Sequence, residues 1–178
     1  MARYWPLTLN APTQPFNDAG GCCTSDLRAP WKNSEQDQKA GRIGAFVSQA
    51  ERLAELQAGA PDYIWAFKTP RGLKGQLQLL ARVRWSDSLR VSELPGPGES
   101  SMYYDPLHAD SVRFPGGAAP EAVDAVTAWA GRYFSVAIRA NFRGRNGQWA
   151  LRGVELAELR KLAACLEAEP FDAAGVAV

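Results

Sequence analysis

The chain has 178 residues and a net charge of +1, with 46% hydrophobic and 22% charged side chains. This composition is typical of a globular domain and excludes a disordered or fibrous chain. Because basic and acidic side chains balance, no overall field attracts the protein to nucleic acid or to an anionic membrane. Any such binding requires a local patch.

No apolar run reaches the roughly 20 residues that cross a bilayer, and residues 1–9 lack the apolar stretch of a secretory signal. The cysteines, Cys22, Cys23 and Cys165, do not have the spacing of a disulfide framework or a zinc clip. We therefore expect a single domain over residues 1–178, located in the cytoplasm and without a membrane partner. Cys165 shares a helical stripe with leucines, which predicts a place in the core.

The first third of the chain reads as a strand, a long irregular segment and a helix. Residues 3–9 alternate and are rich in aromatic side chains, which favours a strand. Residues 10–39 are interrupted by proline and glycine throughout and are predicted to be irregular, with the Gly20–Gly21 pair in a turn. From residue 43 to 58, apolar side chains recur at three- and four-residue steps, the pattern of an amphipathic helix.

Residues 63–68 and 76–85 are strand candidates that enclose a glycine-rich turn, and together they predict a hairpin. Arg82 and Arg84 alternate with apolar residues and are expected on one face of its second strand. Further along the chain we expect strands at 102–104 and 111–114, a helix at 120–129, a strand at 135–139, a turn at 141–148, a helix at 154–168 and a frayed tail at 171–178. This order lacks the regular alternation of a parallel sheet and predicts an α+β fold: a small curved, mainly antiparallel sheet or barrel with about three packed helices.

One histidine and two carboxylates occur close together, at Asp105, His108 and Asp110. They suit a metal or a general base, but the chain has no second histidine with which to complete a zinc site. The alternatives are a plain turn in which the aspartates cap backbone amides, or a pocket opening lined by His108 and the neighbouring tyrosines. No nucleophile motif or phosphate loop is present, so we assign no catalytic residue, no metal and no cofactor.

Arginine and aromatic residues together give the strongest indication of function. The loop 141–149 contains Arg143 and Arg145, follows Arg139 and has no acidic residue. Guanidinium groups bind phosphate through paired hydrogen bonds, and aromatic rings stack on bases, so such a loop suits a nucleic acid. The alternative is a solvated turn whose Trp149 anchors the last helix. Arg82 and Arg84 would extend the loop to a basic groove if the two lie side by side.

Three segments carry a resemblance to a known family: the opening Arg3–Trp5, residues 53–67 and residues 77–83. They resemble PUA-like domains of the EVE and ASCH type, small barrels that in many members bind RNA or modified bases in DNA. The resemblance implies a PUA-like barrel and an aromatic pocket for a base, with Trp5, Trp31, Trp65 and Tyr104 as the matching rings.

We therefore expect a non-catalytic module that holds a base, modified or flipped, in an aromatic pocket, with arginines on the flanking phosphates. The expected phosphate contacts are Arg82, Arg84, Arg139, Arg143, Arg145 and Lys32, and the expected base pocket is formed by Trp5, Trp31, Trp65, Tyr104, His108 and Asn33. RNA and DNA are both open as partners, as are the preferred base and the oligomeric state. The alternatives are an enzyme that acts on a nucleotide or small molecule through Asp105, His108 and Asp110, and a protein-interaction module of phage or defence origin that docks through residues 10–39.

Overall fold

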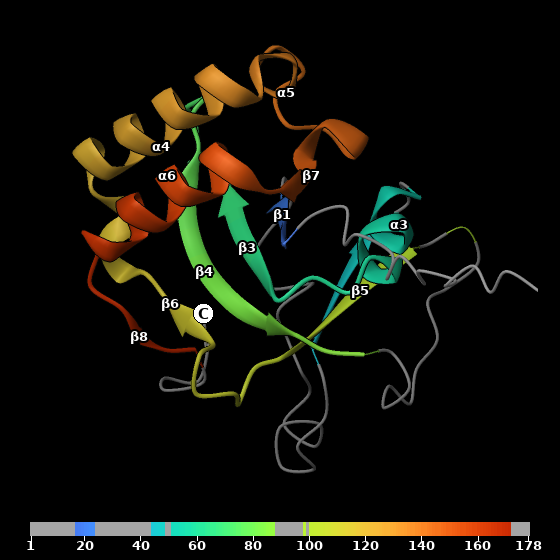
Figure 1. Cartoon of the computed structure of the whole chain (residues 1–178). Coiled ribbons are helices and arrows are strands. Elements are labelled where there is room, and N and C mark those ends of the chain that lie inside the picture. The colour runs from blue at the N-terminus through green and yellow to red at the C-terminus, as the bar shows by residue number, and fades with distance from the viewer. Residues whose placement is uncertain (1–16, 24–43, 49–50, 88–97, 99, 172–178) are drawn as a thin grey trace, which may run out of the picture.

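The structure is a computed structural model that describes residues 17–23, 44–48, 51–87, 98 and 100–171 (Figure 1). Within these residues, eight strands form one mixed sheet that is accompanied by four α-helices, and the α+β class is confirmed. The described strands do not close on themselves. Of the two architectures expected, the described residues therefore form the open curved sheet and not a closed barrel.

The sheet is mainly antiparallel. The strand order is β2-β5-β4-β3-β1-β7, and β6 pairs with β4 and β8. Only β1 and β3 run parallel among the described pairs. The strands are β1 (Asp18–Cys23), β2 (Gly44–Ser48), β3 (Tyr63–Lys68), β4 (Gln78–Trp85), β5 (Ser100–Asp105), β6 (Val112–Arg113), β7 (Gln148–Leu151) and β8 (Glu169–Pro170).

The predicted hairpin is confirmed as β3 and β4. Tyr63 pairs with Arg84 and Trp65 with Arg82, and the register shifts between Ala66 and Phe67. Successive side chains point to opposite faces, so these four residues share one face of the ribbon. The curvature of the long strand β4 is visible in Figure 1.

One face of the sheet is covered by α4 (Pro120–Tyr133), α5 (Ser135–Arg139) and α6 (Gly153–Ala164), with α4 and α6 side by side (Figure 1). Their apolar stripes meet a core that is rich in aromatic rings. Trp129 is fully buried and stacks on Phe67 at a centroid distance of 5.7 Å, and its indole Nε1 donates to the Glu155 carbonyl. The shared ring contacts fix both helices on the sheet.

The opposite face is covered by α3 (Arg52–Ala58), which packs mainly against β5. Leu53 and Leu56 of α3 pack with the small and branched residues of β3 and β4 that alternate with the aromatic face. Phe171 closes this second core with its ring edge-on to Tyr104, at 5.8 Å. Phe171 is only 7% exposed, so the first residue of the segment predicted to fray is anchored, and residues 172–178 lie outside the described range.

The Gly20–Gly21 pair is not a turn but part of the interior strand β1, which corrects the prediction of an irregular segment there. A Cβ on Gly20 would come within 3.2 Å of the Trp149 ring, so glycine lets the tryptophan lie against the strand. The glycine pair predicts a turn, but here glycine occurs within a strand because the absence of a side chain leaves room for a neighbouring ring. The predicted strand 3–9 and the rest of 10–39 fall outside the described residues.

Three further predictions are wrong in part or in full. The helix expected over 43–58 is the strand Gly44–Ser48 followed by a shorter helix, and the strand expected at 135–139 is the helix α5. Gln148, expected as the last residue of a turn, begins a strand over 148–151 that pairs with β1. Such short apolar segments fit both the roughly 3.6-residue period of a helix and the two-residue period of a strand, so tertiary packing selects the conformation. Cys165, expected in the core, is exposed: α6 ends at Ala164, before the predicted end of the helix, and Cys165 is its C-cap.

Candidate functional site

A hollow of about 380 Å³ lies between the end of α4, α5 and β7, and we call it the α5–β7 pocket. β7 is the last strand in the order of the described sheet, so the pocket sits at a sheet edge. It brings together two arginines, three rings and two amides: Arg52, Arg145, Tyr133, Phe134, Trp149, Asn146 and Gln148. This volume falls within the range of clefts that bind small molecules, about 300–1,000 Å³.

The aromatic wall of the pocket is a stacked pair. The rings of Phe134 and Trp149 lie 4.8 Å apart at an interplanar angle of 16°. Trp149 is buried, and its Nε1 donates to the Asn146 carbonyl at 2.9 Å, so it serves as a fixed support. Phe134 is only half-buried and is the ring of this pair that can present a surface to a ligand.

The turn that carries Arg143 and Arg145 has an unusual backbone. Asn141 and Phe142 both have positive φ, at 51° and 54°, a conformation that costs non-glycine residues free energy. The Asn141 carboxamide oxygen accepts the Gly75 amide at 3.1 Å, and Phe142 is buried in the core, so both strained residues are held. A Cβ on Gly147 would overlap the Phe142 carbonyl oxygen. These contacts hold the short helix η3 (Gly144–Gly147), with Arg145 on it, beside the pocket.

The charge at the pocket opening is positive but partly compensated. Arg52 donates to Glu55 at 2.7 Å, and Arg145 lies 3.5 Å from the other carboxylate oxygen. The hydrogen bond from Arg52, aided by Arg145, lowers the pKa of Glu55 below its ordinary value. Two cations therefore share one exposed anion, which a phosphate group could replace.

A second group of arginines lies on the hairpin, and we call Tyr63, Arg82 and Arg84 the arginine–tyrosine shelf. The two guanidinium groups lie 4.9 and 5.2 Å from the centroid of the Tyr63 ring, within cation–π range. Among the described residues, no carboxylate pairs with either arginine. The Tyr63 hydroxyl donates to Asp110 at 2.9 Å, and its pKa is raised by burial and by that acceptor.

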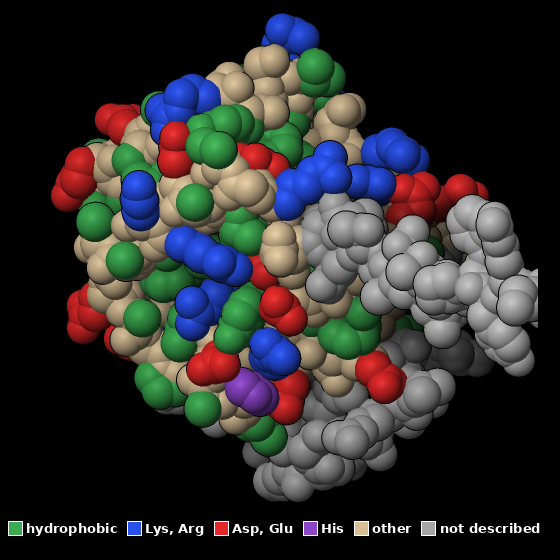
Figure 2. Space-filling view, viewed as in Figure 1, with side chains coloured by type: hydrophobic (Ala, Val, Ile, Leu, Met, Phe, Trp, Pro, Cys, Tyr) green, Lys and Arg blue, Asp and Glu red, His purple; other side chains and the backbone are tan. Residues whose placement is uncertain are grey.

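Beside the shelf lies Asp18, a carboxylate with no exposed surface. Trp65 Nε1 donates to its Oδ2 at 2.8 Å, and the Arg160 guanidinium of α6 lies 3.4 Å from the same oxygen. Its Oδ1 has no partner in the described part of the chain, and burial raises the pKa of Asp18. Figure 2 shows basic side chains at the centre of this face, above the chain's histidine and the acidic groups around it.

The Asp105–Asp110 segment is a turn in which polar side chains bind the backbone. Asp105 accepts the Leu107 amide at 2.9 Å, and His108 Nδ1 accepts the Asp110 amide at 3.1 Å. Over the described residues, no group of three or more His, Cys, Asp or Glu side chains is placed to hold a metal ion. The imidazole and the Asp105 carboxylate thus have structural roles here.

The expected site residues are divided between places. Arg145 lines the α5–β7 pocket, Arg139 and Arg143 are exposed on the segments beside it, and Arg82 and Arg84 form the shelf. Trp65 and Tyr104 are 1% and 0% exposed, so their inclusion in an open base pocket is corrected: core packing covers both rings. His108 is exposed in its turn, and Trp5, Trp31, Lys32 and Asn33 lie outside the described residues.

Sequence reasoning did not single out Arg52, Glu55, Phe134 or Tyr63. Tyr63 could have been found, because the hairpin register places it beside Arg84. Arg52, Glu55 and Phe134 come from α3 and from the junction of α4 with α5, and no local pattern links those segments to β7.

No family model, no curated protein and no solved structure matches the chain. The class of ligand must therefore be argued from the geometry of the site. No helix among the described residues has the length and apolar character needed to span a membrane.

Proposed function

We propose that the protein binds RNA or DNA without catalysing a reaction on it, and that the α5–β7 pocket takes one base. The observation that carries this proposal is the convergence of Phe134, Gln148, Arg52 and Arg145 on one hollow of about 380 Å³. A ring supplies a stacking surface, an amide can read a base edge, and guanidinium groups bind phosphate.

The exposed arginines beside the pocket support a backbone contact. Arg143 and Arg145 lie on a turn without acidic residues, and Arg139 is the last residue of α5, whose first residues line the pocket. Each arginine that neutralises a phosphate releases counterions from the nucleic acid, which makes binding depend on salt. In the proposal the base enters the hollow and its neighbouring phosphates lie along these side chains.

The resemblance of residues 53–67 and 77–83 to EVE and ASCH domains favours the same class of ligand, and a preference for a modified base is part of the proposal. The shelf would add a weaker phosphate contact through Arg84. The base pocket proposed here is lined by Phe134 and Gln148 and not by Trp65 or Tyr104, whose rings are buried.

The proposal is tested with the double variant Arg143→Ala and Arg145→Ala and labelled single-stranded oligonucleotides. Affinity should fall, and the slope of log K against log salt should shrink by about 0.7 for each lost phosphate contact. Arg71→Ala, an exposed arginine in the β3–β4 turn, is the matched control and should leave both quantities unchanged. An unaltered salt slope in the double variant would contradict the proposal.

The stacking part of the proposal is tested separately with Phe134→Leu, which keeps apolar volume against Trp149 but removes the aromatic face. Loss of one base stack should weaken binding by about 1–3 kcal/mol. The salt slope should stay that of the parent protein, because no phosphate contact is lost. An affinity equal to that of the parent protein would show that no base stacks on Phe134 in the pocket.

A further inference from the structure

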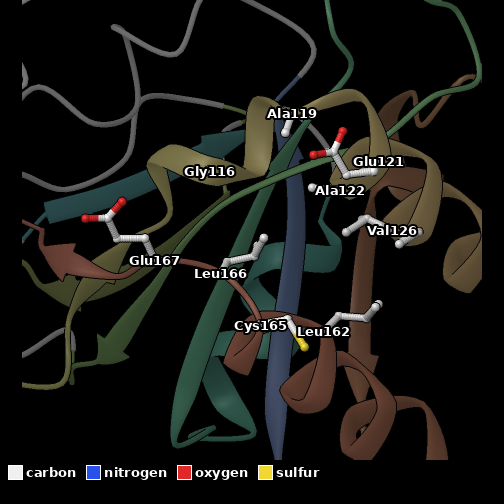
Figure 3. Close-up of a pocket in the computed structure, with 10 residues that line it drawn as sticks. Gly116, Ala119, Glu121, Ala122, Val126, Leu162, Cys165, Leu166 and Glu167 are labelled. Atoms are coloured by element: carbon white, nitrogen blue, oxygen red, sulfur yellow. The ribbon is translucent and has the colours of Figure 1, made fainter.

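A second hollow, of about 410 Å³, lies between the first turns of α4 and the end of α6, and it shares no lining residue with the α5–β7 pocket. Its walls are η2 (Pro115–Ala118) with the first turns of α4 on one side and the end of α6 on the other (Figure 3). We call it the α4–α6 groove.

The floor of the groove is apolar. Val126 of α4, Leu162 of α6 and Leu166 beyond it line the groove together with the small residues Ala122 and Ala125. Leu162 and Leu166 are only partly buried against the core, so part of their surface faces the opening. Such a floor binds an aliphatic or aromatic body by removing apolar surface from water.

The rim of the groove carries two carboxylates and no cation. Glu121 lies on the α4 side and Glu167 on the α6 side (Figure 3). Both are exposed, and neither forms an ion pair or hydrogen bond within the described chain. The end of α6 adds the partial negative charge of a helix C-terminus. Glu121 itself offsets the opposite partial charge at the start of α4.

We propose that the α4–α6 groove binds a small organic cation, a molecule with an apolar body and one ammonium group. The apolar floor takes the body, and the two glutamates hold the charge at the opening. The volume of the groove is that of a site for a small molecule, and it is too small to hold several turns of an amphipathic partner helix. This site is independent of the α5–β7 pocket.

Cys165 provides a reporter at the site, because its exposed thiol lines the groove. A ligand seated there would shield the sulfur from a small alkylating reagent. Cys22, half-buried on β1, lies outside the groove and supplies an internal reference in the same sample.

The experiment measures the alkylation rate of Cys165 by iodoacetamide, read by peptide mass spectrometry, in the presence of three probes of one chain length. Hexyltrimethylammonium should slow the reaction several-fold, hexanol less and hexanoate least, with Cys22 unaffected. Equal protection by all three probes, or none by the cation, would overturn the proposal.

Two variants locate the effect. The double variant Glu121→Gln with Glu167→Gln should weaken the binding of hexyltrimethylammonium by about two- to fivefold, as expected for exposed ion pairs. The binding of hexanol should be unchanged. Ala122→Leu should weaken both by filling the floor. A thermal unfolding scan of each variant checks that the fold is retained, and a cation affinity that survives the double substitution would refute the role of the carboxylates.

Discussion

The α5–β7 pocket and the arginine–tyrosine shelf both present arginines, but they position them by different means. On the shelf, Arg82 and Arg84 take their direction from the two-residue alternation of a regular strand. In the pocket, Arg145 takes its place from a turn with positive φ at Asn141 and Phe142. Regular pairing and irregular backbone thus produce similar chemistry on one protein.

The two regions also differ in how their charge is compensated. The shelf guanidinium groups lie over the Tyr63 ring, whereas Arg52 and Arg145 share the Glu55 carboxylate. A ring supports a cation without neutralising it, and a carboxylate must be displaced before a phosphate can bind. The following variants test how far this difference extends.

The largest expected effect is that of Gly147→Ala on the pocket. Its Cβ would overlap the Phe142 carbonyl oxygen, and overpacking of this kind costs about 1–3 kcal/mol or more. Urea unfolding should show the loss, and oligonucleotide binding should weaken with it. Gly21→Ala is the control, because a Cβ there meets nothing within 4 Å. Equal stability of the two variants would refute the steric role of Gly147.

The shelf side is tested through Asp18→Asn. Burial raises the Asp18 pKa, so the folded state holds that proton more tightly than the unfolded state does. Stability from this group is present at low pH and falls as pH rises from the ordinary aspartate pKa of 3.8 through the raised folded pKa.

Asp18→Asn should therefore gain stability relative to the parent as the pH increases, measured by urea unfolding at a series of pH values. Oligonucleotide affinity should not change, since Asp18 does not line the pocket. A stability difference that is constant with pH would exclude the titration of Asp18.

A smaller effect is expected from Arg82→Ala with Arg84→Ala. If the shelf adds only a secondary phosphate contact, oligonucleotide affinity should fall by about two- to fivefold, less than for the Arg143 and Arg145 variant. Arg82→Lys with Arg84→Lys keeps the charge and is the control. A loss larger than that of the pocket variant would reverse the ranking of the two regions.

The smallest effect is expected from Glu55→Gln, which removes the anion shared by Arg52 and Arg145. Oligonucleotide affinity at low salt should rise by about two- to threefold, because both guanidinium groups become available. Glu51→Gln, an exposed residue just before α3, is the control. Weaker binding in Glu55→Gln would mean that the carboxylate positions the arginines and does not compete for them.

The hairpin at the centre of the sheet and the two longest helices could be predicted from local sequence patterns. The β3–β4 hairpin and the helices α4 and α6 have apolar periods long enough to be distinctive. The strands β1 and β7 could not be predicted, because two glycines and a four-residue segment carry no period of their own. Their pairing depends on the Trp149 ring, which packs over Gly20.

The candidate site was predictable only where it followed a strand. Arg82 and Arg84 were expected on one face and lie there, and the Arg143–Arg145 loop was expected to be basic and exposed. The expected base pocket failed for Trp65 and Tyr104, because a large ring in a strand gains more from burial in the core than from exposure.

The sequence by itself determined the α+β class, the hairpin with its face of alternating arginines, and the amphipathic helices, because each depends on periods between near neighbours. Only the tertiary structure decided which ring stays accessible, that Arg52 of α3 and Arg145 contact the same Glu55 carboxylate, and where the two hollows lie. Those features join segments that are distant along the chain, and their geometry depends on packing and on single steric contacts such as that at Gly147.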